Sequence, residues 1–130
     1  MINKAIVTFG DEVIAAASST EVSERDPLAH DGITVVREAC RRLTQATLSE
    51  CTYFGTAEPC PMCSAALLQT RIGRVGIGAN GEQLERILGL QTIRLENLTL
   101  DYGHRPVIDR GVGSELGLQV LARSLGHGTA

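Results

Sequence analysis

The first apolar runs of the chain are short and are separated by turn residues, which predicts a β-hairpin. Residues 5–9 and 13–17 are runs of strand length, and Gly10-Asp11 between them is a two-residue turn signal. The following stretch, residues 18–29, is polar and contains a proline, so it is expected to form a loop. The chain is therefore predicted to begin with two antiparallel strands and a long connection.

Helical spacing replaces this pattern in the next part of the chain. Apolar side chains recur every three to four residues from His30 to Ala46, which predicts a helix over this range. Either Asp26 or Asp31 is expected to cap its N-terminus. The recurring apolar positions are Ile33, Val36, Cys40 and Leu43.

Strands and helices then alternate to the end of the chain, as in an α/β fold. The predicted strands comprise residues 52–56, 74–78 and 93–95, with a weaker strand at 107–108. The predicted helices comprise residues 60–69, 83–88 and 114–125. Alternation after a hairpin indicates a mixed sheet of about five strands covered by helices. A length of 130 residues fits a single domain over residues 1–130.

Composition and charge narrow the classes of partner. Twelve basic and fifteen acidic residues give a net charge of −3, and aromatic residues make up 3% of the chain. Nucleic-acid binding relies on clustered Lys and Arg and on aromatic stacking, so a nucleic-acid partner is disfavoured. No run approaches the roughly 18 apolar residues that span a bilayer, and no signal peptide is evident. We therefore expect a cytoplasmic protein without a membrane span.

The four cysteines divide into two kinds. Cys40 and Cys51 are isolated and are expected to be small buried side chains with reduced thiols. Cys60 and Cys63 lie three residues apart at a predicted helix start, so both thiols share one face. The positive end of the helix dipole stabilises thiolates there, which makes the pair a clamp for a soft metal such as zinc. His30 is available upstream as a third ligand.

Three segments together resemble the cytidine deaminase superfamily, in the branch that contains guanine deaminase and the tRNA adenosine deaminases. They are residues 26–40, which begin DPLAH, residues 52–63, which read TYFGTAEPCPMC, and residues 71–79, which read RIGRVGIGA. The resemblance implies a three-layer α/β/α fold. It also implies a Zn²⁺ held by His30, Cys60 and Cys63, with a bound water in the fourth position.

The chain departs from the family's pattern on the substrate side. The family's acid/base Glu, two residues after the ligand His, corresponds to Gly32, which cannot carry a proton. The Asn that usually contacts the substrate corresponds to Ser19, which becomes the candidate substrate-binding residue. The helix that normally precedes the first strand is expected to be missing. Replacing Gly32 by Glu is predicted to raise deaminase activity and to stabilise the helix.

Two carboxylates next to the predicted ligands are the candidates for the missing proton carrier. Glu58 is favoured because it directly precedes Pro59-Cys60, although a carboxylate here can instead accept backbone N–H bonds at the helix start. Asp31 is closer in sequence to the lost Glu, but one helical step turns it by about 100°. Weaker candidates in the C-terminal part are Asp101, His104, Asp109 and Glu115.

These features predict a zinc-dependent hydrolytic deaminase of a small amino-heterocycle, such as a free base or nucleoside, with altered acid/base machinery. The alternative is a catalytically inactive deaminase-like zinc protein that serves as a binding or regulatory subunit. A third reading, a structural zinc domain, would need a fourth ligand such as Asp31. A homodimer is expected, because this branch usually pairs through the helices around the metal and the missing helix would leave apolar surface.

Overall fold

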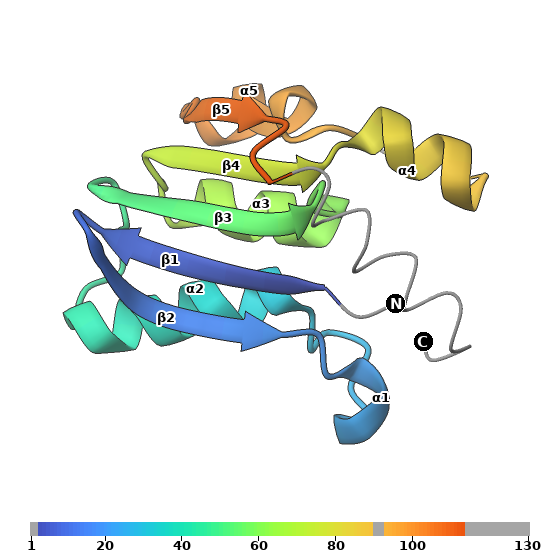
Figure 1. The fold of residues 1–130 in the computed structure, drawn as a ribbon. Coiled ribbons are helices and arrows are strands. Elements are labelled where there is room, and N and C mark those ends of the chain that lie inside the picture. Colours follow the sequence, from blue (N-terminus) through green and yellow to red (C-terminus); the bar gives the residue numbers. More distant parts are fainter. Residues whose placement is uncertain (1–2, 90–92, 114–130) are drawn as a thin grey trace.

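A five-stranded mixed sheet organises the chain in the computed structural model, which describes residues 3–89 and 93–113 (Figure 1). The strand order across the sheet is β2-β1-β3-β4-β5. The strands are β1 (Lys4–Phe9), β2 (Glu12–Ser18), β3 (Cys51–Ala57), β4 (Arg74–Ala79) and β5 (Val107–Arg110). The predicted helix at 114–125 lies outside the described residues.

Antiparallel and parallel pairing meet at β3. The predicted hairpin is present, because β1 pairs antiparallel with β2 around a turn in which Gly10 has a φ of 59°. On its other side β1 pairs antiparallel with β3, whereas β3, β4 and β5 run parallel. Parallel neighbours need a crossover, and a helix supplies it between β3 and β4. The prediction of a mixed α/β sheet is therefore confirmed.

Two helices cover one face of this sheet. Figure 1 shows α2 (Asp31–Leu43) and α3 (Pro61–Gln69) side by side behind the strands. Their apolar faces meet the alternate residues of the strands that point the same way, which is the pattern expected of a half-buried sheet. The fully buried side chains include Val7, Val35, Tyr53, Leu67 and Ile77. Cys51 is buried and Cys40 packs against the core, and both thiols are free, as predicted.

The prediction of a strand at 93–95 is wrong. Residues 95–98 form a short 3₁₀ helix, η1 (Leu95–Leu98), in which the Asn97 side chain accepts the backbone N–H of Arg94. Of the residues in η1, only Leu95 is fully buried in the core. The short apolar run therefore packs one side chain against the core and does not pair as a strand. The fifth place in the sheet belongs to β5, which the sequence indicated only weakly.

Helix boundaries differ from the prediction at several ends. A short helix, α1 (Glu21–Glu24), lies within the predicted loop, and α2 ends at Leu43, where Thr44 has a left-handed φ of 53°. His30 is the N-cap of α2, so neither predicted aspartate caps it. The remaining helices are α4 (Gly81–Leu88), which begins with an Asn80–Gln83 capping box, and α5 (Thr99–Tyr102).

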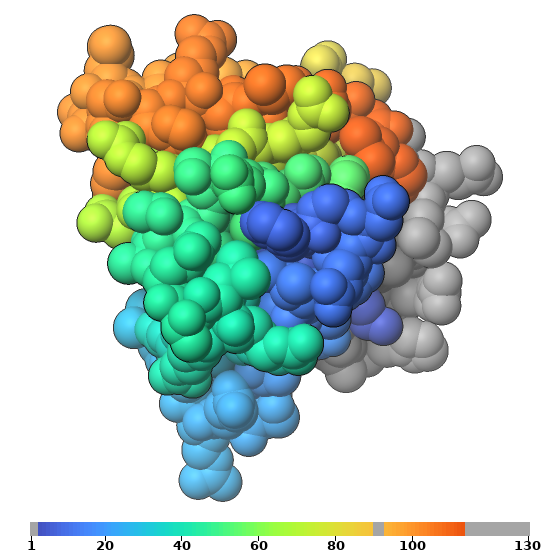
Figure 2. All heavy atoms as spheres, turned by 90° about the vertical axis from the view of Figure 1, so that its left-hand side faces the viewer, coloured from blue at the N-terminus to red at the C-terminus, as the bar shows by residue number. Residues whose placement is uncertain are grey.

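The fold brings three helix starts to one end of the sheet. The segments before α2, α3 and α4 all lie beyond the carboxyl end of β3, at the right of Figure 1. The backbone N–H of Glu58 donates to Ala79 and so joins the ends of β3 and β4. Figure 2 shows the opposite end, where the hairpin and the end of α2 lie side by side. Within the described residues, no helix has the length and apolar character that crossing a membrane requires.

Candidate metal centre

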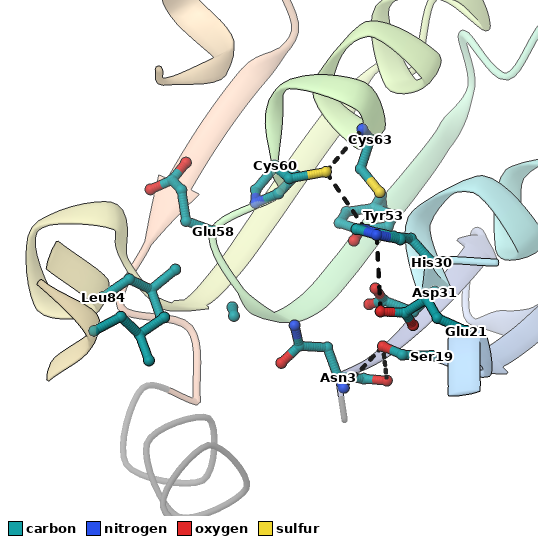
Figure 3. Close-up of a pocket in the computed structure, with 13 residues that line it drawn as sticks. Asn3, Ser19, Glu21, His30, Asp31, Tyr53, Glu58, Cys60, Cys63 and Leu84 are labelled. Atoms are coloured by element: carbon teal, nitrogen blue, oxygen red, sulfur yellow. Dashed lines mark hydrogen bonds and ion pairs between the residues drawn. The ribbon is translucent and has the colours of Figure 1, made fainter. Parts of the chain in front are cut away.

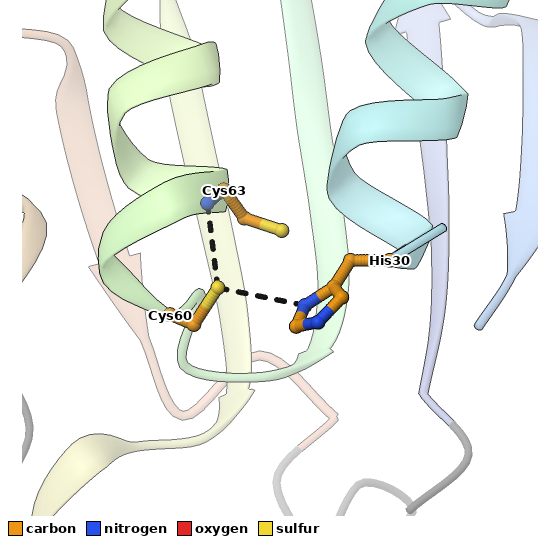
Figure 4. A group of neighbouring side chains, drawn as sticks. All are labelled: His30, Cys60 and Cys63. Carbon is orange, nitrogen blue, oxygen red and sulfur yellow. Dashed lines mark hydrogen bonds between the residues drawn. The ribbon is translucent and has the colours of Figure 1, made fainter. Parts of the chain in front are cut away.

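His30, Cys60 and Cys63 converge between the starts of α2 and α3 (Figure 4). Their ligand atoms all lie within 4.8 Å of one another. His30 Nδ1 is 3.5 Å from Cys60 Sγ. A tetrahedral zinc with ordinary Zn–S and Zn–N bonds would hold such a pair about 3.5 Å apart. The chemistry and the spacing of these donors therefore fit a zinc ion.

Local sequence explains how the two sulfurs are oriented. Cys60 is an extended N-cap residue followed by Pro61, and its Sγ accepts the backbone N–H of Cys63 at 3.4 Å. The hydrogen bond from the Cys63 thiol lowers the pKa of Cys60, while that bond and burial raise the pKa of Cys63. Cys60 is thus the thiol of the pair that ionises first, and thiolates are the form that binds metal.

The second nitrogen of His30 faces a carboxylate that the sequence did not single out. His30 Nε2 lies 3.8 Å from Glu21 Oε2, and both side chains are partly exposed. A ligand histidine commonly presents its other ring nitrogen to a carboxylate, which fixes the ring orientation. Glu21 comes from α1 and is therefore placed to orient His30 with Nδ1 toward the cysteines.

A cavity of about 190 Å³ opens beside the cluster (Figure 3). Drug-sized ligands usually occupy pockets of about 300–1,000 Å³, so this cavity suits a smaller molecule. Leu84 and Leu88 of α4 contribute an apolar wall. The polar residues that line it besides the cluster are Asn3, Ser19, Glu21, Asp31, Tyr53 and Glu58.

Asp31 lies on the cavity wall despite its offset from the lost Glu position. It is the first residue of α2 and is only 8% exposed. Burial raises the pKa of Asp31 to about 6, against the opposing effect of the backbone N–H of Gly32. The expectation that Asp31 faces away from the site does not hold, since the residue lines the cavity together with His30 and Cys60.

The favoured proton carrier, Glu58, is held in a different arrangement. Arg110 donates to both of its oxygens, each at 2.9 Å, and the backbone N–H of Gly81 donates to Oε1 at 2.9 Å. The Glu58 side chain is 0% exposed. Its oxygens are occupied by fixed donors, so the geometry argues against proton transfer by Glu58 and supports the alternative of a carboxylate that accepts backbone N–H bonds.

Arg110 also pairs with a second carboxylate. Its Nη1 and Nη2 donate to the two oxygens of Glu96 at 2.6 and 2.7 Å. Hydrogen bonding to Glu96 and Glu58 raises the pKa of Arg110 further above its ordinary value, and Arg110 lowers the pKa of Glu96. The three side chains join β5, η1 and the segment that leads into Cys60.

Ser19 lines the cavity, but main-chain contacts occupy its hydroxyl. Ser19 Oγ accepts the backbone N–H of Asn3 at 3.0 Å and donates to the carbonyl oxygen of Asn3 at 3.2 Å. The Asn3 side chain itself lines the cavity, and its buried Oδ1 has no hydrogen-bond partner. The Ser19 hydroxyl therefore holds the main chain of Asn3, and the Asn3 amide is the group with an unpartnered atom in the cavity lining.

Gly32 is packed directly against the metal cluster. A Cβ at this position would lie 2.9 Å from both Cβ and Sγ of Cys63. Real Cβ atoms essentially never approach that closely, so a side chain here requires Cys63 to move. This close approach argues against the sequence-based expectation that Gly32→Glu stabilises the helix, because the replacement requires Cys63 to shift.

Several residues at the site carried no local sequence signal. Glu21 falls in the stretch predicted to be a loop, Asn3 immediately precedes β1, and Arg110 meets Glu58 across 52 residues. Of the weaker candidates, His104 bonds to the carbonyl of Ile72 and Asp109 pairs with Arg74, both away from the cavity. Asp101 belongs to α5 and does not line the cavity. Glu115 lies outside the described residues.

Comparisons with known sequences match most of the chain. The MafB19-like deaminase family matches residues 3–103. A tRNA(Ile)-lysidine synthase of Deinococcus deserti is 30% identical over 115 residues, which are 88% of this chain and 21% of that protein. A tRNA-specific adenosine deaminase of Aquifex aeolicus is 41% identical over 71 residues, 55% of this chain and 47% of that protein. The chain thus spans less than half the length of these relatives.

Solved structures give the same result for the fold. A tRNA:A34 deaminase superposes with a TM-score of 0.78 at 27% identity, covering 91% of this chain and 83% of that chain. The guanine deaminase of Nitrosomonas europaea superposes with a TM-score of 0.79 at 25% identity, covering 93% of this chain and 71% of that chain. The sheet and its two covering helices are therefore those of cytidine-deaminase-like proteins.

Proposed function

Because this chain belongs to the MafB19-like deaminase family, we propose that it is a zinc-dependent hydrolytic deaminase of a small amino-heterocycle. The observation that carries the proposal is the convergence of His30, Cys60 and Cys63 at a cavity of small-ligand size. Three protein ligands and an open side are the arrangement of catalytic zinc sites, whereas structural sites have four ligands. Asp31 is not part of the cluster within the described residues, which disfavours the structural reading.

Zinc in this site would supply a bound water whose pKa lies near neutrality. His30, Cys60 and Cys63 would hold the ion, and Glu21 would keep His30 in its ligating orientation. All four cysteines are free, which suits such ligation and the reducing compartment expected from the sequence. The cavity next to the ligands would exclude most water from the bound heterocycle.

We assign proton transfer to Asp31 in preference to Glu58. Asp31 lines the cavity beside His30, whereas Arg110 and Gly81 occupy the oxygens of Glu58. A general acid/base must lie within hydrogen-bond reach of the group it serves, and of these two carboxylates on the cavity wall Asp31 is the one that no arginine occupies among the described residues. This is the altered acid/base machinery that the Gly32 departure calls for.

The small cavity and the net charge of −3 favour a free base or nucleoside over a polymer. A tRNA adenosine is the second candidate substrate, because a tRNA-specific adenosine deaminase and a tRNA:A34 deaminase are among the relatives. A guanine deaminase among the structural neighbours directs the first choice of small molecules toward aminopurines. Parallel assays with small heterocycles and with tRNA distinguish the two.

The test combines metal analysis with ammonia release. Purified protein is expected to contain one zinc per chain and to release ammonia from at least one of guanine, cytosine, adenosine and 2,6-diaminopurine. Cys63→Ala should lose both the zinc and the activity, while Cys40→Ser should keep both. Bound zinc without ammonia release from these compounds or from tRNA would instead favour the inactive binding subunit. No zinc in carefully prepared protein would refute the metal assignment.

We also propose that the protein pairs as a homodimer through the outer surface of α2 and the start of α3. A groove on this surface is lined by Leu28, Ile33 and Met62 and by charged residues that include Arg37 and Glu38, and Leu28 is 59% exposed. An exposed apolar side chain rimmed by polar residues is typical of an interaction site. Sedimentation at micromolar concentration should show a dimer that Leu28→Glu dissociates, and a wild-type monomer would contradict the proposal.

A further inference from the structure

Two glycines from different elements lie against one hydroxyl group. A Cβ at Gly55 would lie 2.7 Å from the Tyr53 hydroxyl oxygen and 3.0 Å from Cε1 of its ring. A Cβ at Gly32 would lie 3.6 Å from the same oxygen. Glycine inside a strand usually marks a place where another group approaches the backbone closely. Here the approaching group in both cases is Tyr53.

The direction of the Tyr53 side chain follows from these contacts. Residues 53 and 55 point to the same face of β3, because side chains alternate along a strand. A ring that covers the backbone of Gly55 therefore leans toward the carboxyl end of the strand, where the segment with Cys60 begins. Figure 3 accordingly draws Tyr53 behind the imidazole of His30 and next to the cysteines.

The Tyr53 side chain brings to the cavity wall a hydroxyl without a hydrogen-bond partner in the described part of the chain. The residue is 1% exposed and lines the cavity. Among residues 3–89 and 93–113, the hydroxyl makes no hydrogen bond. Such a group in a cavity wall is therefore poised to bind a ligand.

We propose that the Tyr53 hydroxyl is a substrate-contacting hydrogen-bond donor beside the metal cluster, in the space that Gly32 and Gly55 leave open. This inference rests on the proposed deaminase function. Tyr53 reaches the same neighbourhood from β3 that a longer side chain at position 32 would reach from α2.

The chemistry of a phenol narrows the class of substrate. A neutral phenol donates one hydrogen bond. The bound heterocycle must therefore present an acceptor, a ring nitrogen or an oxo group, next to the carbon that carries the amine. Aminopurines and aminopyrimidines meet this requirement, because the amine-bearing carbon in their rings adjoins a ring nitrogen.

Tyr53→Phe tests the contact, because it removes only the oxygen. Tyr102→Phe is the matched control, since Tyr102 is the other tyrosine of the chain and belongs to α5, away from the cavity. Zinc content, thermal unfolding, 2,6-diaminopurine binding and ammonia release are measured for both variants and the wild type. Tyr53→Phe is expected to keep its zinc and its unfolding temperature and to lose about 10- to 100-fold in binding and in kcat/KM.

The outcomes separate this contact from the proposed function. A zinc-loaded wild type that neither binds 2,6-diaminopurine nor acts on the other test heterocycles overturns the function, and the contact with it. If the wild type binds or turns over one of these compounds and Tyr53→Phe has the same affinity and kcat/KM, the contact alone is overturned. A Tyr53→Phe variant that loses zinc or unfolds early shows a structural hydroxyl and also overturns the contact. Gly55→Ala, which displaces the ring, should weaken binding in the same direction as Tyr53→Phe.

Discussion

Asp31 and Glu58 each lie within two residues of a candidate metal ligand in the sequence, but the fold surrounds them differently. Figure 3 shows them on opposite sides of the cavity. Asp31 is met by backbone N–H groups and by the ligands, and no arginine pairs with it among the described residues. Glu58 is fully covered and is clamped by Arg110 from β5. A position near a candidate ligand in the sequence therefore does not define the role of a carboxylate. The role depends on the side chains that contact it from distant segments, such as Arg110.

The largest expected effect separates the two carboxylates by activity. Asp31→Asn should keep the zinc and lower kcat by about 10²–10⁴-fold, the usual contribution of a general acid/base. Glu58→Gln should change kcat by less than about tenfold, because Arg110 and Gly81 already occupy the carboxylate oxygens of Glu58. Steady-state kinetics on zinc-matched samples measures both values. A severe loss in Glu58→Gln beside an active Asp31→Asn would reverse the assignment.

Glu58 is expected to matter more for stability than for activity, through its ion pair with Arg110. Arg110→Ala leaves the Glu58 charge buried without its partner, and such a change costs about 3–5 kcal/mol of unfolding free energy. Arg74→Ala is the matched control, since its pair with Asp109 is about half exposed and is expected to contribute under about 1 kcal/mol. Urea unfolding of both variants gives the comparison. Equal midpoints for the two would mean that Glu58 does not depend on the guanidinium.

A side chain at position 32 should disturb the Asp31 side of the cavity. Gly32→Glu is expected to destabilise the protein by about 1–3 kcal/mol and to weaken zinc binding, because its Cβ overlaps Cys63. Thr34→Glu places the same side chain two residues later in α2, at a half-buried position, and should have a smaller effect. Urea unfolding and zinc competition with a chelator report the difference. Higher ammonia release in Gly32→Glu would instead support the original sequence hypothesis.

The smallest expected effect concerns the residue behind His30. Glu21→Ala removes the carboxylate that faces Nε2 and should lower zinc affinity by about 10- to 100-fold without altering the fold. Glu24→Ala changes a neighbouring exposed carboxylate of α1 that binds Thr20, and should leave zinc affinity unchanged. Competition titration measures both affinities. Identical values for the two variants would remove Glu21 from the metal site.

Much of the fold was predictable because its patterns are local. The hairpin around Gly10, the helical spacing of α2 and the strand at residues 52–56 follow from side chains within one element. The prediction of a strand at 93–95 was wrong because so short an apolar run is compatible with a strand, a helix or a turn. Long-range strand pairing selects between them. Val107 pairs with Arg74 in the sheet, and the sequence pattern around either residue does not predict that pairing.

The sequence by itself determined the candidate metal ligands of this protein. His30, Cys60 and Cys63 were identifiable because ligand chemistry and helix-start geometry are encoded over a few residues. Only the tertiary structure decided how the other polar groups are used. Arg110 reaches Glu58 across 52 residues, and Tyr53 gains its room from glycines on two separate elements. The physical reason is that ligation depends on short-range spacing, whereas hydrogen-bond partners and packing depend on which distant segments the sheet brings together.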